Sequence, residues 1–307
     1  MTSAAPRESG VGAIVLGAGA VFIFSLLFAW SAGQIWEDYF ITFRSSRNLV
    51  EGLGLVYQAG ERVHTFTSPL GVLVPALGYR IFPSDEGPIW FLRVVSACAL
   101  AGTAALLARH AVEQGWSRAL WWLVLCLSVL EAKTVAFSTN GMESALLVFF
   151  AALAWREITR LGGPRVVSLA IAAGGLMWTR PDACVLLAAM LGGWWLFGDR
   201  RFEREVWRGG WARALLFGAL LYLPWFIWAW SYYGSPVPQT IVAKSALAPE
   251  GAGLLRMLAA PLRCLVSETA LDGLFAPVYA NAGGWPRDLL NVARLLARLS
   301  AFLWLVP

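Results

Sequence analysis

Apolar residues in this chain gather in long runs and do not alternate with polar residues, a pattern typical of helices that cross a lipid bilayer. The first run extends from Val11 to Gly33, which is long enough to span and too long for the core of a signal peptide. We interpret it as a retained anchor. Further spans are predicted at 89–108, 119–137, 144–158, 166–178, 182–197, 212–232 and 289–306. The sequence therefore predicts an all-α, polytopic membrane protein with about eight spans.

Composition and charge support this class and exclude others. The chain is 58% hydrophobic with a mean hydropathy of +0.62, more apolar than a soluble domain can bury. Its net charge is +5, but the arginines lie in short connections without a basic stripe interleaved with aromatic residues, so we expect no nucleic-acid partner. The four cysteines are scattered singly, without the spacing of a disulfide framework or a metal site.

The arginines between the predicted spans are unevenly distributed. Ten of them lie in three connections, residues 109–118, 156–165 and 198–213. The two connections that alternate with these carry only Arg180. Because cytoplasmic loops are enriched in basic residues, we expect the arginine-rich side to be cytoplasmic.

This orientation defines the first outer loop. If the N-terminus is inside, residues 34–88 form one extracytoplasmic loop. The apolar run Ser68–Phe82 within it cannot cross, since a crossing would invert the first helix. It is 15 residues long and contains Pro75, so we predict a helix that lies in or near the outer interface.

Two adjacent acids, Glu37 and Asp38, begin a predicted amphipathic helix at the outer end of the first span. Carboxylates there suit the positive end of the helix dipole. On the same face, Arg44 lies two turns beyond Glu37, and Arg47 follows one turn later. The pair is open to three interpretations: solvated charges, a site for a divalent cation such as Mg²⁺ or Mn²⁺, or a catalytic base.

Other charges lie at the same predicted side. Glu143 occurs in "NGMES", Arg180 and Asp182 in "WTRPD", and Lys244 in "SPVPQTIVAKS". The spans next to Glu143 and Arg180 have apolar cores of roughly 12 to 15 residues, shorter than the roughly 20 that cross hydrocarbon. Their outer ends are therefore expected to stop below the surface and to leave a polar cavity, which a phosphate-bearing lipid would suit.

These motifs, in order, carry a resemblance to a known family. The segments "EDYFITFRSSRNLVEGLGLVYQAGERVHTFTSPL", "GMESAL", "TRPD" and "PQTIVAKS" are similar to GT-C superfamily membrane glycosyltransferases, especially the bacterial arabinofuranosyltransferase and protein mannosyltransferase-like branch. The resemblance extends from about Gln34 to Ala246. It implies that a sugar is taken from a polyprenyl-phosphate donor and moved, with inversion, to a hydroxyl of a glycan, glycolipid or protein acceptor. The reaction would face the extracytoplasmic side of the cell membrane.

The chain also departs from that pattern. The acidic pair is often Asp-Asp in the family, and the segment that usually ends in Glu-Gly-aromatic reads Val63-His64-Thr65-Phe66 here. Family members are commonly longer. We therefore expect residues 1–307 to form a single GT-C-like transmembrane domain, with any C-terminal soluble domain absent from this chain.

The chemistry of sugar transfer gives each of these residues a hypothetical role. Asp38 or Glu37 would be the base that takes the acceptor proton, or the pair would hold a divalent ion. Cations would neutralise the leaving lipid phosphate, and Glu143 would hold the donor sugar, a metal or a neighbouring arginine. The candidates for the donor phosphate are Lys244, Arg180 and Arg44, and those for the vicinity of the acceptor are His64, Arg47 and Asp182.

Two other classes fit some of these features. A transporter or a flippase for lipid-linked sugars would also place charges in a membrane cavity, but no internal repeat is visible and the charges favour one face. A non-catalytic membrane assembly partner would keep the fold without the chemistry. The ionisable side chains at 37, 38, 180 and 244 favour an enzyme.

Overall fold

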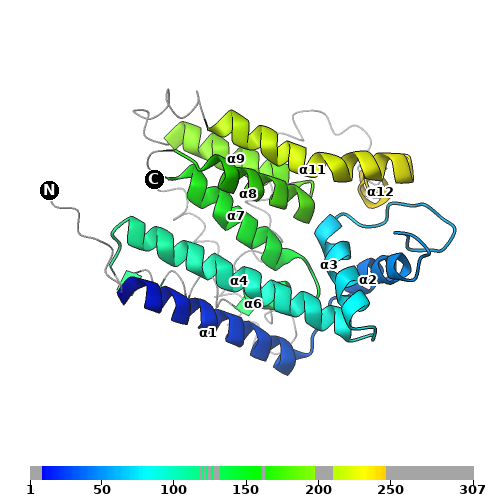
Figure 1. The fold of residues 1–307 in the computed structure, drawn as a ribbon, viewed down its shortest axis with the longest axis horizontal. Coiled ribbons are helices and arrows are strands. Elements are labelled where there is room, and N and C mark those ends of the chain that lie inside the picture. The colour runs from blue at the N-terminus through cyan, green and yellow to red at the C-terminus, as the bar shows by residue number, and fades with distance from the viewer. Residues whose placement is uncertain are drawn as a thin grey trace, which may run out of the picture. The chain divides into compact units, whose positions relative to one another are not determined.

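A computed structural model describes residues 9–117, 119–120, 122–123, 126, 132–160, 163–197 and 210–246, and these residues contain helices and no strand (Figure 1). The helices are α1 (Ser9–Ala32), α2 (Glu37–Val50), α3 (Pro69–Ile81), α4 (Gly87–Glu113), α6 (Ala132–Thr139), α7 (Ser144–Ile158), α8 (Val166–Thr179), α9 (Ala183–Phe197), α11 (Trp211–Tyr233) and α12 (Gln239–Ala246). Contacts divide the chain into two units, 1–242 and 243–307. The first unit contains α1 to α11 and the start of α12.

The helices confirm the class predicted from the hydrophobic pattern. By length and composition, α1, α4 and α11 are long and apolar enough to cross a membrane. The helices α7, α8 and α9 coincide with predicted spans but have only 15, 14 and 15 residues. The predicted span 119–137 is described only in part, and 289–306 lies outside the described residues. The count of about eight spans stays a prediction.

The helices of the first unit pack in a simple order. α1 lies beside α4, α4 beside α7, α7 beside α8, and α8 beside α11 (Figure 1). Small residues allow the last pair to approach closely, because a Cβ on Gly218 would lie only 2.7 Å from the Cβ of Ala173. Large apolar side chains such as Leu16 and Leu216 remain exposed, as expected of surfaces that face lipid.

Two shorter helices, α2 and α3, pack together at one end of α4, and α3 also contacts α8. α3 confirms the helix predicted at 68–82. It begins where the Ser68 hydroxyl accepts a hydrogen bond from the Gly71 amide at 2.8 Å, with Pro69 in the first turn. The Ser46 hydroxyl of α2 donates to the Val72 carbonyl of α3 at 2.7 Å, and this bond is buried. Whether α3 lies at a membrane interface stays a prediction.

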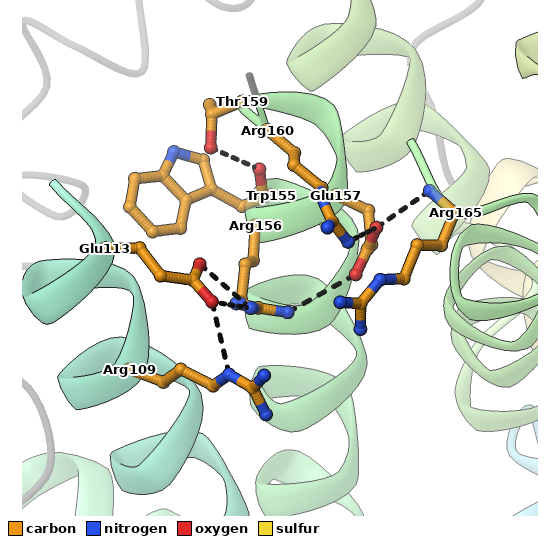
Figure 2. A network of polar contacts seen from close by, with 8 residues as sticks. All are labelled: Arg109, Glu113, Trp155, Arg156, Glu157, Thr159, Arg160 and Arg165. Carbon is orange, nitrogen blue, oxygen red and sulfur yellow. Dashed lines mark hydrogen bonds and ion pairs between the residues drawn. The ribbon is translucent and has the colours of Figure 1, made fainter. Parts of the chain in front are cut away.

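An ion-pair network joins the C-terminal ends of α4 and α7 (Figure 2). The Arg156 guanidinium donates to both carboxylate oxygens of Glu113, at 2.7 and 2.9 Å, and to Glu157 at 3.3 Å. Glu157 is almost fully buried, and it also accepts a hydrogen bond from the Arg165 amide at 2.9 Å. Buried charges are tolerated when they are paired in this way. Because α7 has 15 residues, its two ends lie about 22 Å apart.

Candidate active site

The first turn of α2 is held against the turn that precedes α7. The Trp36 amide donates to the Asn140 carbonyl at 2.7 Å. Arg93, a buried residue of α4, donates from Nε to the Thr139 carbonyl and from Nη2 to the Gln34 carbonyl, both at 3.0 Å. One guanidinium therefore fixes the segment that carries Glu37 and Asp38 relative to the segment that carries Glu143.

Close packing adds to this attachment. Tyr39, which directly follows Asp38, is 1% exposed and stacks on Phe43 with ring centroids 5.6 Å apart. Its side chain lies on Gly141, where a Cβ would be 2.9 Å from the Cβ and Cγ of Tyr39. Gly141 has φ of +102°, which favours glycine independently of space. The turn before α7 is thus shaped to receive the start of α2.

Glu143 is the buried acid of this region. It is 6% exposed, and its Oε1 lies 3.8 Å from Nη1 of Arg180. Its Oε2 faces the first turn of α3, because a Cβ on Gly71 would lie 3.4 Å from that oxygen. Burial raises the pKa of Glu143; Arg180 opposes this shift, while the charges of Asp182 and Asp38 add to it. Asp38 is therefore within electrostatic reach of Glu143.

Arg180 is shared between two acids. Its Nε and Nη2 donate to the two carboxylate oxygens of Asp182, both at 3.0 Å, in a bidentate pair. Since Glu143 is the second partner, the positive charge of Arg180 is already balanced. A phosphate at this place would need a further cation or a rearrangement of the pair.

An apolar groove begins at the same place. It is a cavity of about 490 Å³ between α8, α11 and the start of α12. Pro181, the residue between Arg180 and Asp182, lines it. Other lining residues are Met177, Tyr222, Phe226, Pro238 and Ile241. The groove thus joins a charged cluster to a surface suited to a hydrocarbon chain.

The structure brings together four of the predicted site residues, namely Asp38, Glu143, Arg180 and Asp182. Glu37 and Asp38 are both exposed, and neither forms an ion pair within the described part of the chain. They begin α2, as predicted. The side chain of Lys244 lies outside the described residues, although its backbone belongs to α12.

The other predicted residues have different neighbours. The Arg44 guanidinium sits over the Tyr57 ring, 4.5 Å from its centroid. Arg47 forms an ion pair with Glu51 at 2.7 Å. His64 is 4% exposed and lines a separate pocket. The assigned roles of these three residues stay predictions.

A divalent cation would have few protein ligands here. Among the described residues, no three His, Cys, Asp or Glu side chains are grouped so that they could hold a metal ion. Glu37 and Asp38 nevertheless supply carboxylate oxygens, and Mg²⁺ is often bound by one or two carboxylates together with substrate phosphate oxygens. The residues present fit Mg²⁺ or Mn²⁺ only if the donor phosphate completes the ligand set.

Sequence reasoning missed Arg93, Asn140 and Gly141, which build the site without reacting. A signal for Arg93 was present, because it is a charged residue inside the predicted span 89–108, where ionisable side chains are costly and commonly functional. Nothing in the sequence indicated that Asn140 would accept from the Trp36 amide, since that contact joins segments about 100 residues apart.

The described helices and their charged cluster define a helical membrane protein, and comparisons with known proteins narrow this class. A terminal beta-(1->2)-arabinofuranosyltransferase of Mycobacterium tuberculosis is 27% identical over 250 residues, covering 72% of this chain and 37% of the relative. The protein of the same name from Corynebacterium glutamicum is 26% identical over 300 residues, covering 80% of this chain and 39% of the relative. The chain thus spans less than two fifths of either relative. No protein-family model and no solved structure matches it significantly. Both relatives are glycosyltransferases by name.

Proposed function

We propose that the protein is an integral membrane glycosyltransferase of the GT-C type that uses a polyprenyl-phosphate sugar as donor. The sugar moves, with inversion, to a hydroxyl of a glycan, glycolipid or protein acceptor on the extracytoplasmic side of the cell membrane. The two relatives make arabinofuranose the first sugar to test. The observation that carries the proposal is an exposed carboxylate, Asp38, within electrostatic reach of the buried Glu143 and its partner Arg180, on a segment that Arg93 fixes through the Gln34 carbonyl.

Asp38 is assigned as the general base, with Glu37 as its helper. The acceptor oxygen attacks the anomeric carbon while the bond from that carbon to the phosphate oxygen breaks. The acceptor proton passes to the carboxylate, and the polyprenyl phosphate leaves with the bonding electrons. This single displacement inverts the anomeric centre. An exposed carboxylate on a fixed helix start suits the role, because the acceptor must reach it from water.

Glu143 and Arg180 are assigned to the donor. Glu143 is buried and lies 3.8 Å from Arg180, so its carboxylate is positioned to accept a hydrogen bond from a sugar hydroxyl of the donor. Arg180 and Asp182 flank Pro181, which lines the apolar groove, so a polyprenyl chain in the groove would bring its phosphate close to them. Because Asp182 already balances Arg180, the phosphate needs another cation. We assign Lys244 to that role, with Arg44 as the second candidate.

Asp38→Asn tests the base directly. The change keeps size and hydrogen-bonding shape but removes proton acceptance, so transfer should fall by about 10²- to 10⁴-fold while donor binding survives. The assay is transfer of labelled sugar from a panel of polyprenyl-phosphate sugars to mixed acceptors by the purified full chain. Asp85→Asn is the matched control, because Asp85 is an exposed acid of the same loop. Asp38→Asn turnover at a tenth of the parental rate or better would refute the assignment.

The sidedness of the reaction needs its own test. In a variant without the four native cysteines, a cysteine at Ser84, which is exposed, should react with an impermeant reagent added to intact cells. A cysteine at Arg201 should not react, because it lies in a predicted cytoplasmic connection. Labelling of position 201 from outside would reverse the orientation and contradict an extracytoplasmic active site.

A further inference from the structure

A second cavity, of about 340 Å³, lies where the loop before α3 meets the end of α11 and the start of α12. It is more polar than the apolar groove between α8 and α11. The lining residues are Arg62, Val63, His64, Tyr233, Ser235 and Gln239. None of them belongs to the charged cluster around Glu143, so the cavity is a separate candidate site.

The walls of this cavity are well fixed. The His64 ring stacks on Tyr233, with centroids 4.5 Å apart and planes 9° apart, and meets the edge of Phe66. The His64 carbonyl accepts a hydrogen bond from the Gln239 amide at 2.9 Å. The Tyr233 hydroxyl donates to the Leu55 carbonyl. A pocket whose aromatic and imidazole walls are held in this way loses little conformational freedom when a ligand binds.

The polar side chains that line the cavity are not all paired. Nδ1 of His64 is buried without a hydrogen-bond partner, an arrangement that folded proteins usually avoid. Burial lowers the pKa of His64 to about 4, so the imidazole is neutral at physiological pH. The groups that face it are the Tyr233 ring and the neighbouring Arg62. Arg62 lies over the Tyr232 ring, 5.0 Å from its centroid, and forms no ion pair within the described part of the chain.

The chain itself links this cavity to the charged cluster. His64 and Ser68 are four residues apart, so their Cα atoms are at most about 14 Å apart. The Ser68 hydroxyl binds the Gly71 amide, and Gly71 lies against Glu143. A chain-like ligand that occupies the cavity can therefore extend toward the proposed site of transfer.

We propose that this cavity binds a sugar ring of the acceptor, next to the residue that receives the new sugar. The inference rests on the proposed function. A neutral imidazole, a carboxamide and a guanidinium against aromatic rings match the alternating hydroxyls and apolar face of a saccharide. A phosphate fits less well, since Arg62 is the one cation among the described residues that line the cavity, and its face is already turned to Tyr232.

The protein's two histidines make a direct binding test practical. In the full chain labelled with ¹⁵N-histidine and held in nanodiscs, an arabinofuranose tetrasaccharide should shift the His64 imidazole signals. His64→Gln assigns those signals. His110, in the last turn of α4, should not respond and serves as the internal control. Inorganic phosphate at the same concentration should leave both histidines unchanged. A His64 response to phosphate and none to the tetrasaccharide would overturn the proposal.

Variants of the rim provide the second test. Arg62 and Gln239 are both exposed residues of the cavity. The variants Arg62→Gln and Gln239→Ala should each raise the Kd for the tetrasaccharide and the KM for the acceptor by about fivefold. Glu61→Gln, the exposed neighbour that does not line the cavity, should change neither value. Transfer with an unchanged acceptor KM in both rim variants would overturn this inference and leave the proposed function intact. The opposite result is that the tetrasaccharide binds, that binding is weakened in both variants, and that the protein shows no transfer. This result would support a saccharide site in the cavity and refute the proposed transferase function.

Discussion

Replacing Gly141 by alanine should reduce both stability and activity. Gly141 has φ of +102°, and a Cβ there would lie 2.9 Å from the Cβ and Cγ of Tyr39. Backbone strain of this kind costs about 1–3 kcal/mol. Overpacking against a buried side chain adds roughly 1–3 kcal/mol. The expected loss in the free energy of unfolding is therefore about 2–6 kcal/mol.

Gly52→Ala is the matched control, because it separates strain from packing. Gly52 also has a positive φ, +82°, but a Cβ there would have no neighbour within 4 Å. The control should show only the strain, so Gly141→Ala should unfold at a temperature lower by roughly 2–12 °C. Thermal unfolding of both purified variants in the same detergent measures this difference.

Activity gives the second measurement for Gly141→Ala. Because Tyr39 directly follows Asp38, moving Tyr39 away from the turn displaces the proposed base from Glu143. Transfer should fall in Gly141→Ala at temperatures where the variant is still folded, and should persist in Gly52→Ala. If both variants unfold at the same temperature and both keep full transfer, the start of α2 does not pack on this turn.

Three further predictions concern other parts of the chain. Burial lowers the pKa of His64 to about 4 from about 6.5 in the unfolded chain, so its contribution to stability is present above pH 6.5 and falls by about 3 kcal/mol toward pH 4. His64→Gln should remove this part of the pH dependence of thermal unfolding, and identical profiles would contradict the buried, neutral ring. Glu157→Gln should cost about 1–3 kcal/mol of stability, because it removes the buried charge that pairs with Arg156 while Arg156 keeps Glu113, yet transfer per folded molecule should stay unchanged at the distant site. Lys244→Met should weaken donor affinity strongly without lowering the unfolding temperature, and donor affinity within twofold of the parent would count against its role.

The hydrophobic pattern predicted individual helices well. The first span, the acidic start of α2 and the short α3 follow from local features that the sequence displays directly, namely a long apolar run, two acids after it, and a serine before Pro69. Each of these features determines the structure of residues that are only a few positions away along the chain. The number of spans is less accessible, since helices of 14 and 15 residues are compatible with several placements in a bilayer.

The sequence was sufficient to predict several residues of the candidate site but not how these residues are arranged. Glu143, Arg180 and Asp182 share a side of the predicted topology, which is sufficient to group them. The approach of Arg180 to Glu143, and the attachment of the start of α2 through Arg93 and Asn140, join segments that are far apart in the sequence. Such contacts leave no periodic signal. The pairing of Arg47 with Glu51 differs, because the two residues are one helical turn apart and their spacing alone indicates it.

The bond between Tyr233 and Leu55 has a consequence for biosynthesis. The two residues are 178 positions apart, yet their hydrogen bond attaches the loop between α2 and α3 to the end of α11. At a synthesis rate of 5–20 residues per second, Tyr233 follows Leu55 by about 9–36 s. During that time the loop lacks this partner. The cavity lined by His64 and Tyr233 is therefore expected to be among the last parts of the protein to form, and chains arrested before α11 should insert their early helices without forming it.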